Sequence, residues 1–323
     1  MPTRANTHTT QPIKELFLRR NVENLICDQV SPTVYVNKKN GKYYRYDDAN
    51  ISIGASGDVS DVLSSRGGAN EVDHDFSEAE YNIRNYGYKE WIDGDVYDDA
   101  DDEIQQEARP GTLLNVKDKL LLQKERRLAD LIFASGNYSG QTSALVGGDR
   151  WDDPNSTPTA NFLTAASAVN LGSGYMVNSL ILGWEAMLGL QYNPDILRLL
   201  SDNNEKVVTR SILSKILMTK GVNIPEQNIY VGSQTYKEEK TDATAQYIWG
   251  KSALFAYIDK KASTKKGDTL VKTFRQKDNK GDTYEFYPDP DKSKNGEWCY
   301  AKLGYGHEMV NFKCGYLFTT VVN

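Results

Sequence analysis

The chain has 323 residues, of which 39% are apolar and 25% are charged, and its net charge is -6. These values describe a globular chain that is long enough for two domains or for one large α/β domain. No apolar run reaches the roughly 20 residues that a membrane-spanning helix needs. A pI near 5.3 argues against a protein that binds nucleic acid through its phosphates.

Residues 1–33 are predicted to form a flexible N-terminal arm. The first residues are polar and rich in threonine, and they lack the apolar stretch of a secretory signal. The three cysteines, Cys27, Cys299 and Cys314, are far apart and odd in number, so they indicate neither a metal site nor a disulfide framework. We expect buried thiols in a reducing compartment.

Residues 34–90 are predicted to leave the body of the molecule and return to it. The β-prone runs on either side of Asn40-Gly41 predict a hairpin over residues 34–46. Residues 51–66 are rich in Gly, Ser and Asp, which indicates an extended loop. Apolar and charged residues then alternate again, as in strands with one wet face. Because a two-stranded ribbon is marginal on its own, we expect it to gain its missing partner surface from a sister molecule.

Charge is segregated along the chain. Residues 71–107 contain 14 acidic and 2 basic residues, a local net charge of -12, whereas residues 206–280 contain 15 basic and 7 acidic residues, a local net charge of +8. Two interpretations stay open. Either both segments are solvated faces, or the acidic arm of one subunit meets the basic domain of a neighbour, where opposite charge sets orientation more than affinity.

One long amphipathic helix is predicted over residues 112–134. Arg109-Pro110-Gly111 breaks the preceding pattern, and Thr112 is placed to cap the helix. Apolar residues then recur with helical spacing. About 22 residues at 1.5 Å each give a rod of about 33 Å, which suits an element that spans a flat, wide molecule. The acidic residues before it are expected either to stabilise its N-terminal end or to repel misplaced copies of the chain.

Residues 158–270 alternate short helices with short strands, which predicts a compact α/β domain with its own core. The preceding residues 136–158 are predicted to be a loop. Residues 271–323 are strand-like, and we assign them to strands that return to the domain of the long helix. The expected elements are helices over 159–169, 184–190, 194–200 and 209–219 and strands over 180–182, 228–231, 253–258, 270–274, 284–287, 297–302 and 309–322.

Motifs for catalysis or metal binding are missing from the sequence. None of the three histidines, His8, His74 and His307, lies in a nucleophile motif, and strand alternation separates His74 from its flanking aspartates. Residues 93–107 fail the spacing of a calcium loop, and residues 171–175 lack the third glycine of a dinucleotide-binding loop. We therefore predict no catalytic, cofactor-binding or metal-binding residues, and a protein that is not an enzyme.

The order of these elements resembles the major capsid protein of tailed bacteriophages, the HK97-like fold. The similarity covers about residues 34–260. The segment from Gly67 to Asp73, followed by Tyr81 and Tyr86-Gly87-Tyr88, is similar to the descending strand of the family's extended loop, and residues 119–133 are similar to its spine helix. Further matches in the family's order are Trp151-Asp152-Asp153, Pro158, 178–183, 193–196 and 248–251.

The resemblance implies an α+β fold with an N-terminal arm (1–33), a long β extended loop (34–90), a peripheral domain with the spine helix (91–157), an α/β axial domain (158–270) and returning strands (271–323). It implies a structural subunit that self-assembles into the icosahedral head shell around a phage genome. The axial domains would meet at five-fold and six-fold axes, and the extended loop would lie across a neighbour's peripheral domain. Pro110-Gly111 and the lack of a long coiled-coil prefix depart from the family's pattern.

The implied partners are sister copies in pentamers and hexamers, with room for scaffolding, portal or decoration proteins and for nonspecific contact with packaged DNA in the lumen. The implied location is the virion, and the host cytoplasm during assembly. No cofactor, membrane partner or covalent cross-link is assigned. The residues expected to contact neighbouring subunits are Tyr43, Tyr44, Tyr46, Arg66, Glu71, Asp73, Asp75, Phe76, Tyr81, Tyr86, Tyr88, Asp93 and Asp95.

Two other classes of function stay open on the residues alone. The many tyrosines and tryptophans suit a carbohydrate- or partner-binding module that presents aromatic rings on its surface. The many carboxylates suit a hydrolase whose acids the spacing does not identify. We rank the binding module second and the hydrolase last.

Overall fold

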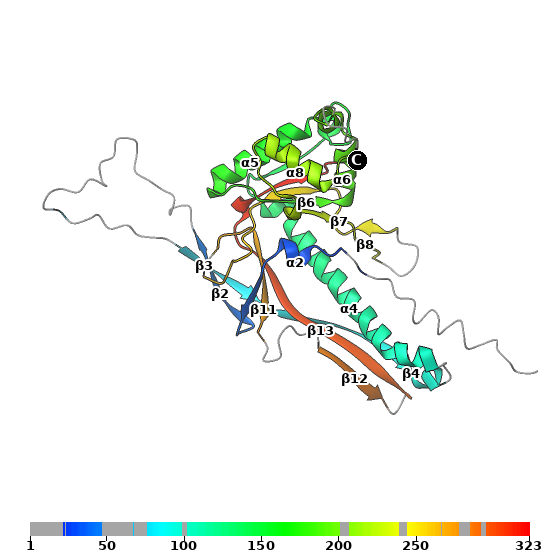
Figure 1. The fold of residues 1–323 in the computed structure, drawn as a ribbon. Coiled ribbons are helices and arrows are strands. Elements are labelled where there is room, and N and C mark those ends of the chain that lie inside the picture. The colour runs from blue at the N-terminus through cyan, green and yellow to red at the C-terminus, as the bar shows by residue number, and fades with distance from the viewer. Residues whose placement is uncertain are drawn as a thin grey trace, which may run out of the picture.

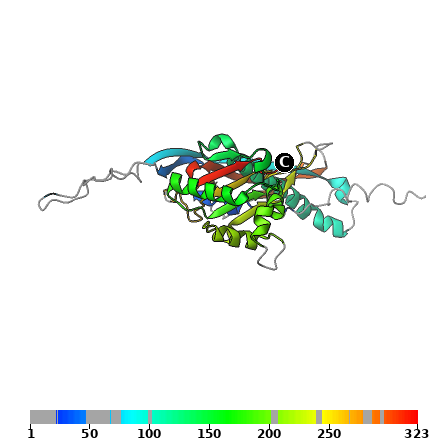
Figure 2. The ribbon, with the colours of Figure 1, turned by 90° about the horizontal axis from the view of Figure 1, so that it is seen from above.

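A computed structural model describes residues 24–46, 76–98, 102–200, 207–238, 244–265, 267–277, 285–291 and 295–323, together with residues 22 and 67. Two five-stranded sheets organise this part of the chain, and a long helix, α4, runs from one sheet to the other (Figure 1). Seen from above, the molecule is wide and flat (Figure 2). The mixture of separate sheets and helices confirms the predicted α+β class.

The first sheet is built around one long strand, β13. The first ten residues of β13 pair with β4, its last four pair with β11, and β12 pairs with its N-terminal half. Strand β1 extends the sheet by pairing in parallel with β11. The strands are β1 (Thr33–Val36), β4 (Arg84–Asp93), β11 (Val271–Gln276), β12 (Glu285–Asp291) and β13 (Gly296–Met309).

Helix α4 (Asp102–Ile132) lies along the first sheet and is 31 residues long. The predicted break at Pro110 and the predicted start at Thr112 are therefore wrong, because Pro110 lies inside the helix. A proline there removes one hydrogen bond and crowds the turn before it. Packing on both sides compensates: Val116 packs near Ala301 of β13 beyond the proline, and Arg109 forms an ion pair with Glu297 just before it.

The predicted hairpin over residues 34–46 does not form. Strand β2 (Asn40–Tyr46) pairs with β3 (Phe76–Asn82) instead of with β1, and Asn40-Gly41 begins β2 rather than making a turn. The two segments that flank the predicted turn thus belong to different sheets. Together, β2 and β3 form a two-stranded ribbon, which we call the β2–β3 ribbon.

Burial explains why the local turn signal fails. Val34 and Val36 of β1 join a buried cluster with Phe274 of β11, so the parallel pairing removes these apolar side chains from water. Instead of making a turn, Gly41 leaves room for a side chain of the paired strand β3. A Cβ on Gly41 would lie 2.5 Å from the hydroxyl oxygen of Tyr81, its partner across the strands.

The second sheet has the strand order β5-β14-β10-β6-β7, and every residue of β6, β7 and β10 is buried. Helices α5 to α8 belong to the same domain, and α5, α6 and α8 cover one face of the sheet (Figure 1). The elements are β5 (Thr142–Ala144), β6 (Ser179–Gly183), β7 (Ile229–Gly232), β10 (Ala253–Ala256), β14 (Gly315–Thr319), α5 (Pro158–Ser173), α6 (Trp184–Tyr192), α7 (Pro194–Arg198) and α8 (Arg210–Thr219).

The other face of the second sheet packs on the C-terminal end of α4. Ile181 and Leu254, which alternate with residues of the helix-covered face, share a buried cluster with Leu128 and Ile132 of α4. The long helix thus contributes to the cores of both sheets. Short elements complete the fold: α2 (Cys27–Val30), α3 (Gly94–Asp98), β8 (Thr235–Tyr236), β9 (Gln246–Tyr247) and the 3-10 turns Ser135–Asn137, Gly147–Asp149, Glu226–Asn228 and Phe312–Cys314.

The four helices predicted between residues 159 and 219 are confirmed as α5 to α8. Two other predicted segments, the loop 136–158 and the returning strands 271–323, differ from the observed sheets. The predicted loop 136–158 contains β5, and the C-terminal strand β14 pairs with β5 and β10 in the second sheet rather than returning to the first. Trp151 is fully buried in the core of the second sheet. Apolar runs identify these strands, but only packing decides which sheet they join.

Candidate assembly interface

The β2–β3 ribbon projects from one edge of the molecule (Figure 1). Aromatic packing attaches its root to the body: the ring of Tyr81 stacks on that of Phe274, with 4.5 Å between centroids, and the Tyr43 ring lies 5.3 Å from the same Phe274 ring. The Tyr43 hydroxyl also donates to the carbonyl of Met309 at 3.3 Å. The body therefore sets the direction in which the ribbon leaves.

Two of the predicted contact residues are used inside the chain. Tyr43 is 1% exposed and Tyr81 is 6% exposed, so both rings fill this chain's own core and offer almost no surface to a neighbour. We therefore remove them from the proposed contact set. Tyr44 is half-buried on β2. The side chains of Tyr46 and Phe76, and the whole of Arg66, Glu71, Asp73 and Asp75, lie outside the described residues.

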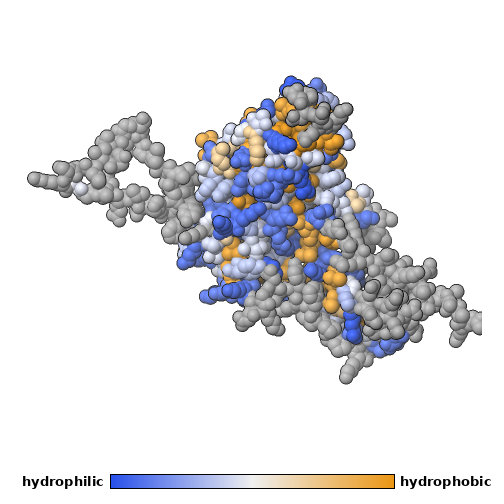
Figure 3. Space-filling view, in the orientation of Figure 1, coloured by the Kyte–Doolittle hydropathy of each residue, from blue (hydrophilic) through white to orange (hydrophobic). Residues whose placement is uncertain are grey.

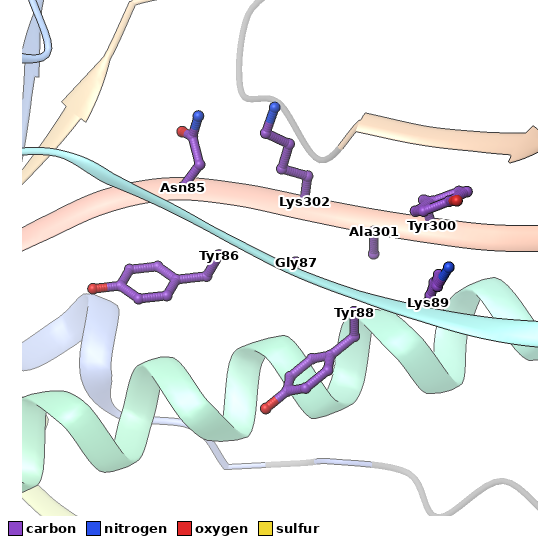
Figure 4. Close-up of a pocket in the computed structure, with 8 residues that line it drawn as sticks. All are labelled: Asn85, Tyr86, Gly87, Tyr88, Lys89, Tyr300, Ala301 and Lys302. Atoms are coloured by element: carbon purple, nitrogen blue, oxygen red, sulfur yellow. The ribbon is translucent and has the colours of Figure 1, made fainter.

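Tyr86 and Tyr88 point from β4 toward α4 (Figure 4). The guanidinium carbon of Arg127 lies 3.9 Å from the centre of the Tyr86 ring, and an Arg127 nitrogen donates to the Tyr305 hydroxyl at 2.7 Å. These contacts bind the sheet to the helix, so Tyr86 has a structural role within the chain. Tyr88 is 41% exposed and keeps a free surface for a neighbour.

Asp93 and Asp95 organise the connection between β4 and β13. The Asp95 amide donates to the Asp93 carboxylate at 3.0 Å, and the Asn295 side-chain amide donates to the Asp95 carboxylate. The Gly94 amide donates to the Asn295 carbonyl at 2.7 Å. This network gives both aspartates, which are exposed, partners inside the subunit.

An open hollow of about 370 Å³ lies on the first sheet. Its lining includes Asn85, Gly87 and Lys89 of β4 and Tyr300 and Lys302 of β13. Tyr86, Tyr88 and Ala301 also line it, and no described residue of α4 does. We call it the Gly87 hollow.

Strand pairing explains how the hollow forms. Lys302 is the register partner of Gly87 and Tyr300 that of Lys89, and directly paired residues share a face. Figure 4 shows the side chains of Asn85 and Lys302 on the side away from Tyr86 and Tyr88. A Cβ on Gly87 would meet only a backbone oxygen, that of Ala301, at 3.2 Å. The missing side chain of Gly87 thus leaves the space open.

Lysines and aromatic rings flank the Gly87 hollow. The exposed ammonium of Lys89 lies 4.0 Å from the ring centre of Trp298 and 5.7 Å from that of Tyr300. Trp298 in turn packs against Trp91, with 4.9 Å between ring centroids. Such a surface suits an anionic partner that brings some flat or apolar surface with it.

The buried carboxylate of Glu125 connects three parts of the chain. Glu125 of α4 accepts hydrogen bonds from the backbone amides of Ile26 and Cys27 at 2.9 and 2.8 Å and from the indole nitrogen of Trp249 at 2.7 Å. Burial raises the pKa of Glu125, and the three donors act against that shift. The segment before β1, the long helix and the second sheet's domain therefore meet at one residue.

A second group, the half-buried His307, lies beside this junction. The Nδ1 atom of His307 lies 2.8 Å from the Thr273 hydroxyl, which itself lies 2.6 Å from the Ser31 hydroxyl. Burial, with the nearby cations of Lys124 and Arg127, lowers the pKa of His307 to about 3. The imidazole is therefore neutral near pH 7, and it helps to link the segment before β1 to the first sheet.

The described residues offer little for catalysis or metal chemistry. Among them, no three His, Cys, Asp or Glu side chains come together as metal ligands, and no helix is long and apolar enough to cross a bilayer. All three cysteines are buried and free, and burial raises the pKa of Cys299 to about 11. These thiols are protonated near pH 7, which makes them poor nucleophiles.

Apolar side chains are exposed on the domain of the second sheet, which forms the upper part of the view in Figure 3. Exposed apolar groups on a folded chain are candidates for contact with a partner when they gather on one domain. The exposed large apolar residues of this domain are Val146, Leu163, Leu171, Tyr175, Met176, Trp184, Tyr192, Val207 and Met218.

Comparison with known proteins shows which proteins this chain resembles. No protein-family model matches the chain. It is 25% identical over 252 residues to the major capsid protein of Pseudomonas phage JBD67, covering 76% of both chains. It is 23% identical over 160 residues to the major capsid protein of Burkholderia phage BcepMu, covering 48% of this chain and 49% of that relative.

The fold agrees with the sequence similarity. A phage-related protein from Bordetella bronchiseptica matches with a TM-score of 0.70 at 17% identity over 95% of both chains. The capsid of cyanophage P-SCSP1u matches with a TM-score of 0.57 at 11% identity over 94% of this chain and 93% of that one. This chain has the HK97-like fold of phage capsid proteins. The resemblance predicted from the sequence is thereby confirmed.

Within this capsid fold, sequence reasoning missed the Gly87 hollow. Lys89 and Lys302 are 213 positions apart in the chain, and neither belongs to a motif. Gly87 itself was noted only as part of Tyr86-Gly87-Tyr88. The signal is a glycine inside an alternating strand, which often marks a close approach of another backbone. The strand that supplies Lys302 becomes known only from the pairing of β4 with β13.

Proposed function

We propose that this chain is the structural subunit that self-assembles into the icosahedral head shell enclosing a phage genome. The observation that carries this proposal is the combined likeness to phage capsid proteins, in sequence over 76% of the chain and in fold over about 95% of it. A shell repeats the same few contacts under symmetry, so each contact can be modest in strength. The flat body and the projecting ribbon suit that use.

The first sheet with α4 is the proposed peripheral domain, and the second sheet with α5 to α8 is the proposed axial domain. Exposed apolar side chains on the second would meet their counterparts around five-fold and six-fold axes, in pentamers and hexamers. The proposed location is the virion, and the host cytoplasm during assembly. Scaffolding, portal and decoration proteins are further proposed partners, and packaged DNA would touch the lumen without sequence preference.

The proposed contact residues are the members of the predicted set that are not assigned to this chain's own core or to the hydrogen-bond network around Asn295. Tyr88 qualifies through its exposure, and Tyr44 is only half-buried. The acidic residues before β3 qualify through their charge, because 71–107 carries a local net charge of -12. The set is Tyr44, Tyr46, Arg66, Glu71, Asp73, Asp75, Phe76 and Tyr88.

A structural role without catalysis is part of this proposal. The relatives with significant sequence similarity are named major capsid proteins, and nothing in the comparisons favours a carbohydrate-binding module or a hydrolase. The buried, protonated thiols and the neutral His307 are consistent with groups that stabilise a fold.

Imaging of the purified chain tests the proposal. Negative-stain electron microscopy and size-exclusion chromatography over a range of concentrations should reveal closed shells, capsomers or tubes. A strictly monomeric species at every concentration, with measurable glycan binding, would instead support the binding-module alternative. Turnover that disappears on replacement of one carboxylate would support the hydrolase.

A further inference from the structure

The chain contains two Asn-Gly pairs, Asn40-Gly41 and Asn295-Gly296. In such a pair, the backbone nitrogen of the glycine can attack the side-chain carbonyl carbon of the asparagine, because both groups belong to one molecule and need no encounter. Glycine carries no Cβ that crowds this attack, and its backbone rotates freely. Both pairs therefore have residue types that can lose the side-chain amide spontaneously, and the fold decides which pair reacts.

The pair Asn295-Gly296 lies at the start of β13 and is contacted from two sides. The amide of Gly94 donates to the backbone carbonyl of Asn295 at 2.7 Å, and the side-chain amide of Asn295 donates to the carboxylate of Asp95. Asn295 is exposed, so water reaches its side chain. Its φ of 46° lies in the left-handed region, which asparagine tolerates better than most residues. The pair thus has a donor on its backbone and an anion beside its side chain.

Each of these two contacts favours one step of amide loss. The glycine nitrogen becomes a nucleophile when it loses its proton, and the negative charge then spreads onto the carbonyl oxygen of the same peptide. That oxygen accepts from the amide of Gly94, which stabilises the charge as it develops. The leaving nitrogen gains a proton and positive charge, which the carboxylate of Asp95 stabilises.

The other pair, Asn40-Gly41, lies within the ladder of the β2–β3 ribbon. Gly41 pairs with Tyr81, and just before the pair the Ile83 amide donates to the Lys39 carbonyl at 2.9 Å. A Cβ on Gly41 would lie 2.5 Å from the Tyr81 hydroxyl oxygen, so the tyrosine side chain lies against the glycine. Ring closure requires the backbone to leave its extended form, which would break hydrogen bonds of the ladder. The ladder therefore slows the reaction at Asn40.

We infer that Asn295 is a site of spontaneous deamidation in the folded protein. The nitrogen of Gly296 forms a bond to Cγ of Asn295, the bond from Cγ to Nδ2 breaks, and Nδ2 leaves as ammonia with the proton that Gly296 has lost. Water then opens the resulting succinimide at either carbonyl, which gives aspartate or isoaspartate. The net reaction consumes one water molecule and releases one ammonia. This modification goes beyond the proposed shell function and does not depend on it.

Packing explains why a glycine follows Asn295. A Cβ on Gly296 would overlap the ring of Trp91 and the backbone carbonyl oxygen of Ile92. A larger residue therefore does not fit at the start of β13 while β4 stays in place, and the reactive pair is a consequence of this close approach.

The product changes the connection between β4 and β13. The group that donates to Asp95 becomes a carboxylate, so a hydrogen bond is replaced by repulsion between like charges. Asp93 adds a further negative charge, because its carboxylate accepts from the Asp95 amide at 3.0 Å. Deamidation should therefore loosen this connection as the protein ages.

Peptide mass spectrometry of the purified full chain tests the inference. The protein is incubated in mildly alkaline buffer and then digested with an acid-active protease, so that digestion adds little deamidation. In the folded chain, conversion of Asn295 should be at least about tenfold faster than that of Asn40. In urea, where the contacts and the ladder are lost, the two rates should agree within about twofold. Equal rates in the folded chain, or a ratio that urea leaves unchanged, would overturn the inference.

A variant of Asp95 tests the role of its carboxylate. Asp95→Asn should slow the conversion of Asn295 by about threefold to tenfold, because the charge beside the leaving nitrogen is lost. The matched control is Asp98→Asn, an exposed aspartate on the same short helix α3, which should leave the rate unchanged. The same rate in both variants would show that Asp95 does not assist the reaction.

The effect of the product is measured with two further variants. Asn295→Asp supplies the new charge directly and should lower the thermal midpoint by about 1–3 °C relative to Asn295→Gly, which tolerates the same φ without a charge. Equal midpoints would show that deamidation leaves the connection between β4 and β13 intact.

Discussion

At the scale of single residues, Glu125 is the clearest example of a charged group that the fold requires. It is 0% exposed and accepts three hydrogen bonds from donors far apart in the sequence, at Ile26, Cys27 and Trp249. Carboxylates are rarely buried without such partners, because an unpaired buried charge is very unfavourable. Its role is to hold the segment before β1 and the domain of the second sheet on the long helix.

Replacement of this carboxylate should destabilise the subunit. In Glu125→Gln one acceptor oxygen becomes a donor that faces another donor, so we expect the free energy of unfolding to fall by about 3 kcal/mol. Urea unfolding of the unassembled chain measures it. The control is Asp130→Asn on the same helix, whose carboxylate is 68% exposed and lies 3.8 Å from Arg126; it should change stability by less than about 1 kcal/mol. Equal effects would contradict the assigned role.

His307 should make stability depend on pH. Its pKa is about 3 in the folded chain and about 6.5 when unfolded, so the unfolded state binds more protons between these values. The stabilising contribution is complete above pH 6.5 and is lost as the pH falls through this window. From pH 7.5 to pH 5.5 the loss is about 1.4 kcal/mol. Urea unfolding at both values should show a smaller decrease for His307→Gln; an identical decrease would show that His307 titrates normally.

At the scale of elements, α4 shows how packing overrides a local helix breaker. Pro110 is exposed, and the helix continues through it because Arg109 and Val116, on either side, are held to β13. The predicted helix is confirmed, but it starts ten residues earlier than predicted, because the helix continues through Pro110.

Removal of this proline should stabilise the helix. Pro110→Ala restores one backbone hydrogen bond and relieves the crowded turn, so we expect a gain of about 1–3 kcal/mol in the free energy of unfolding. Pro194 is a matched control because it is exposed and lies at the first position of α7, where no amide hydrogen is needed. Pro194→Ala should give no gain. A loss of stability in Pro110→Ala would mean that the proline suits a bend in α4.

At the scale of the whole molecule, we expect folding to depend on the body and on the root of the β2–β3 ribbon, and assembly to depend on the residues beyond that root. The root of the ribbon is fixed by Tyr43, Tyr81 and Phe274, which belong to this chain's own core. The connecting residues 47–66 lie outside the described residues. Their composition predicts that they contribute little to a core, so the subunit should fold without part of them.

Deletion of residues 50–66 should therefore leave a folded chain that assembles poorly. We expect a thermal midpoint within a few degrees of the wild type and at least a tenfold lower fraction of shells, because we propose that this connection contacts a neighbour and its composition predicts little contribution to this chain's core. Circular dichroism and sedimentation measure the two effects. Normal assembly of the deletion would show that this connection is not an intersubunit clamp.

Much of this architecture is visible in the sequence. Helical periodicity identified the long helix and α5 to α8, and the buried run at 180–182 identified β6. The acidic alternation before β3 also needs no structure, since it depends only on neighbouring residues. The spacing of apolar residues along the chain indicates which face of a helix or strand is apolar. About ten to twenty residues are enough to show it.

Only the tertiary structure decided which distant strands pair. Strand β1 pairs with β11 rather than with β2, and β14 pairs with strands of the second sheet. Strand β4 pairs with β13, which places Lys89 near Lys302. The reason is physical. The residues of an apolar strand favour a β-strand but do not specify which strand lies beside it. The pairing depends on the total apolar surface that segments far apart in the chain bury together. The sequence by itself therefore determined the elements and the kind of molecule, and the packing determined which residues lie together on its surface.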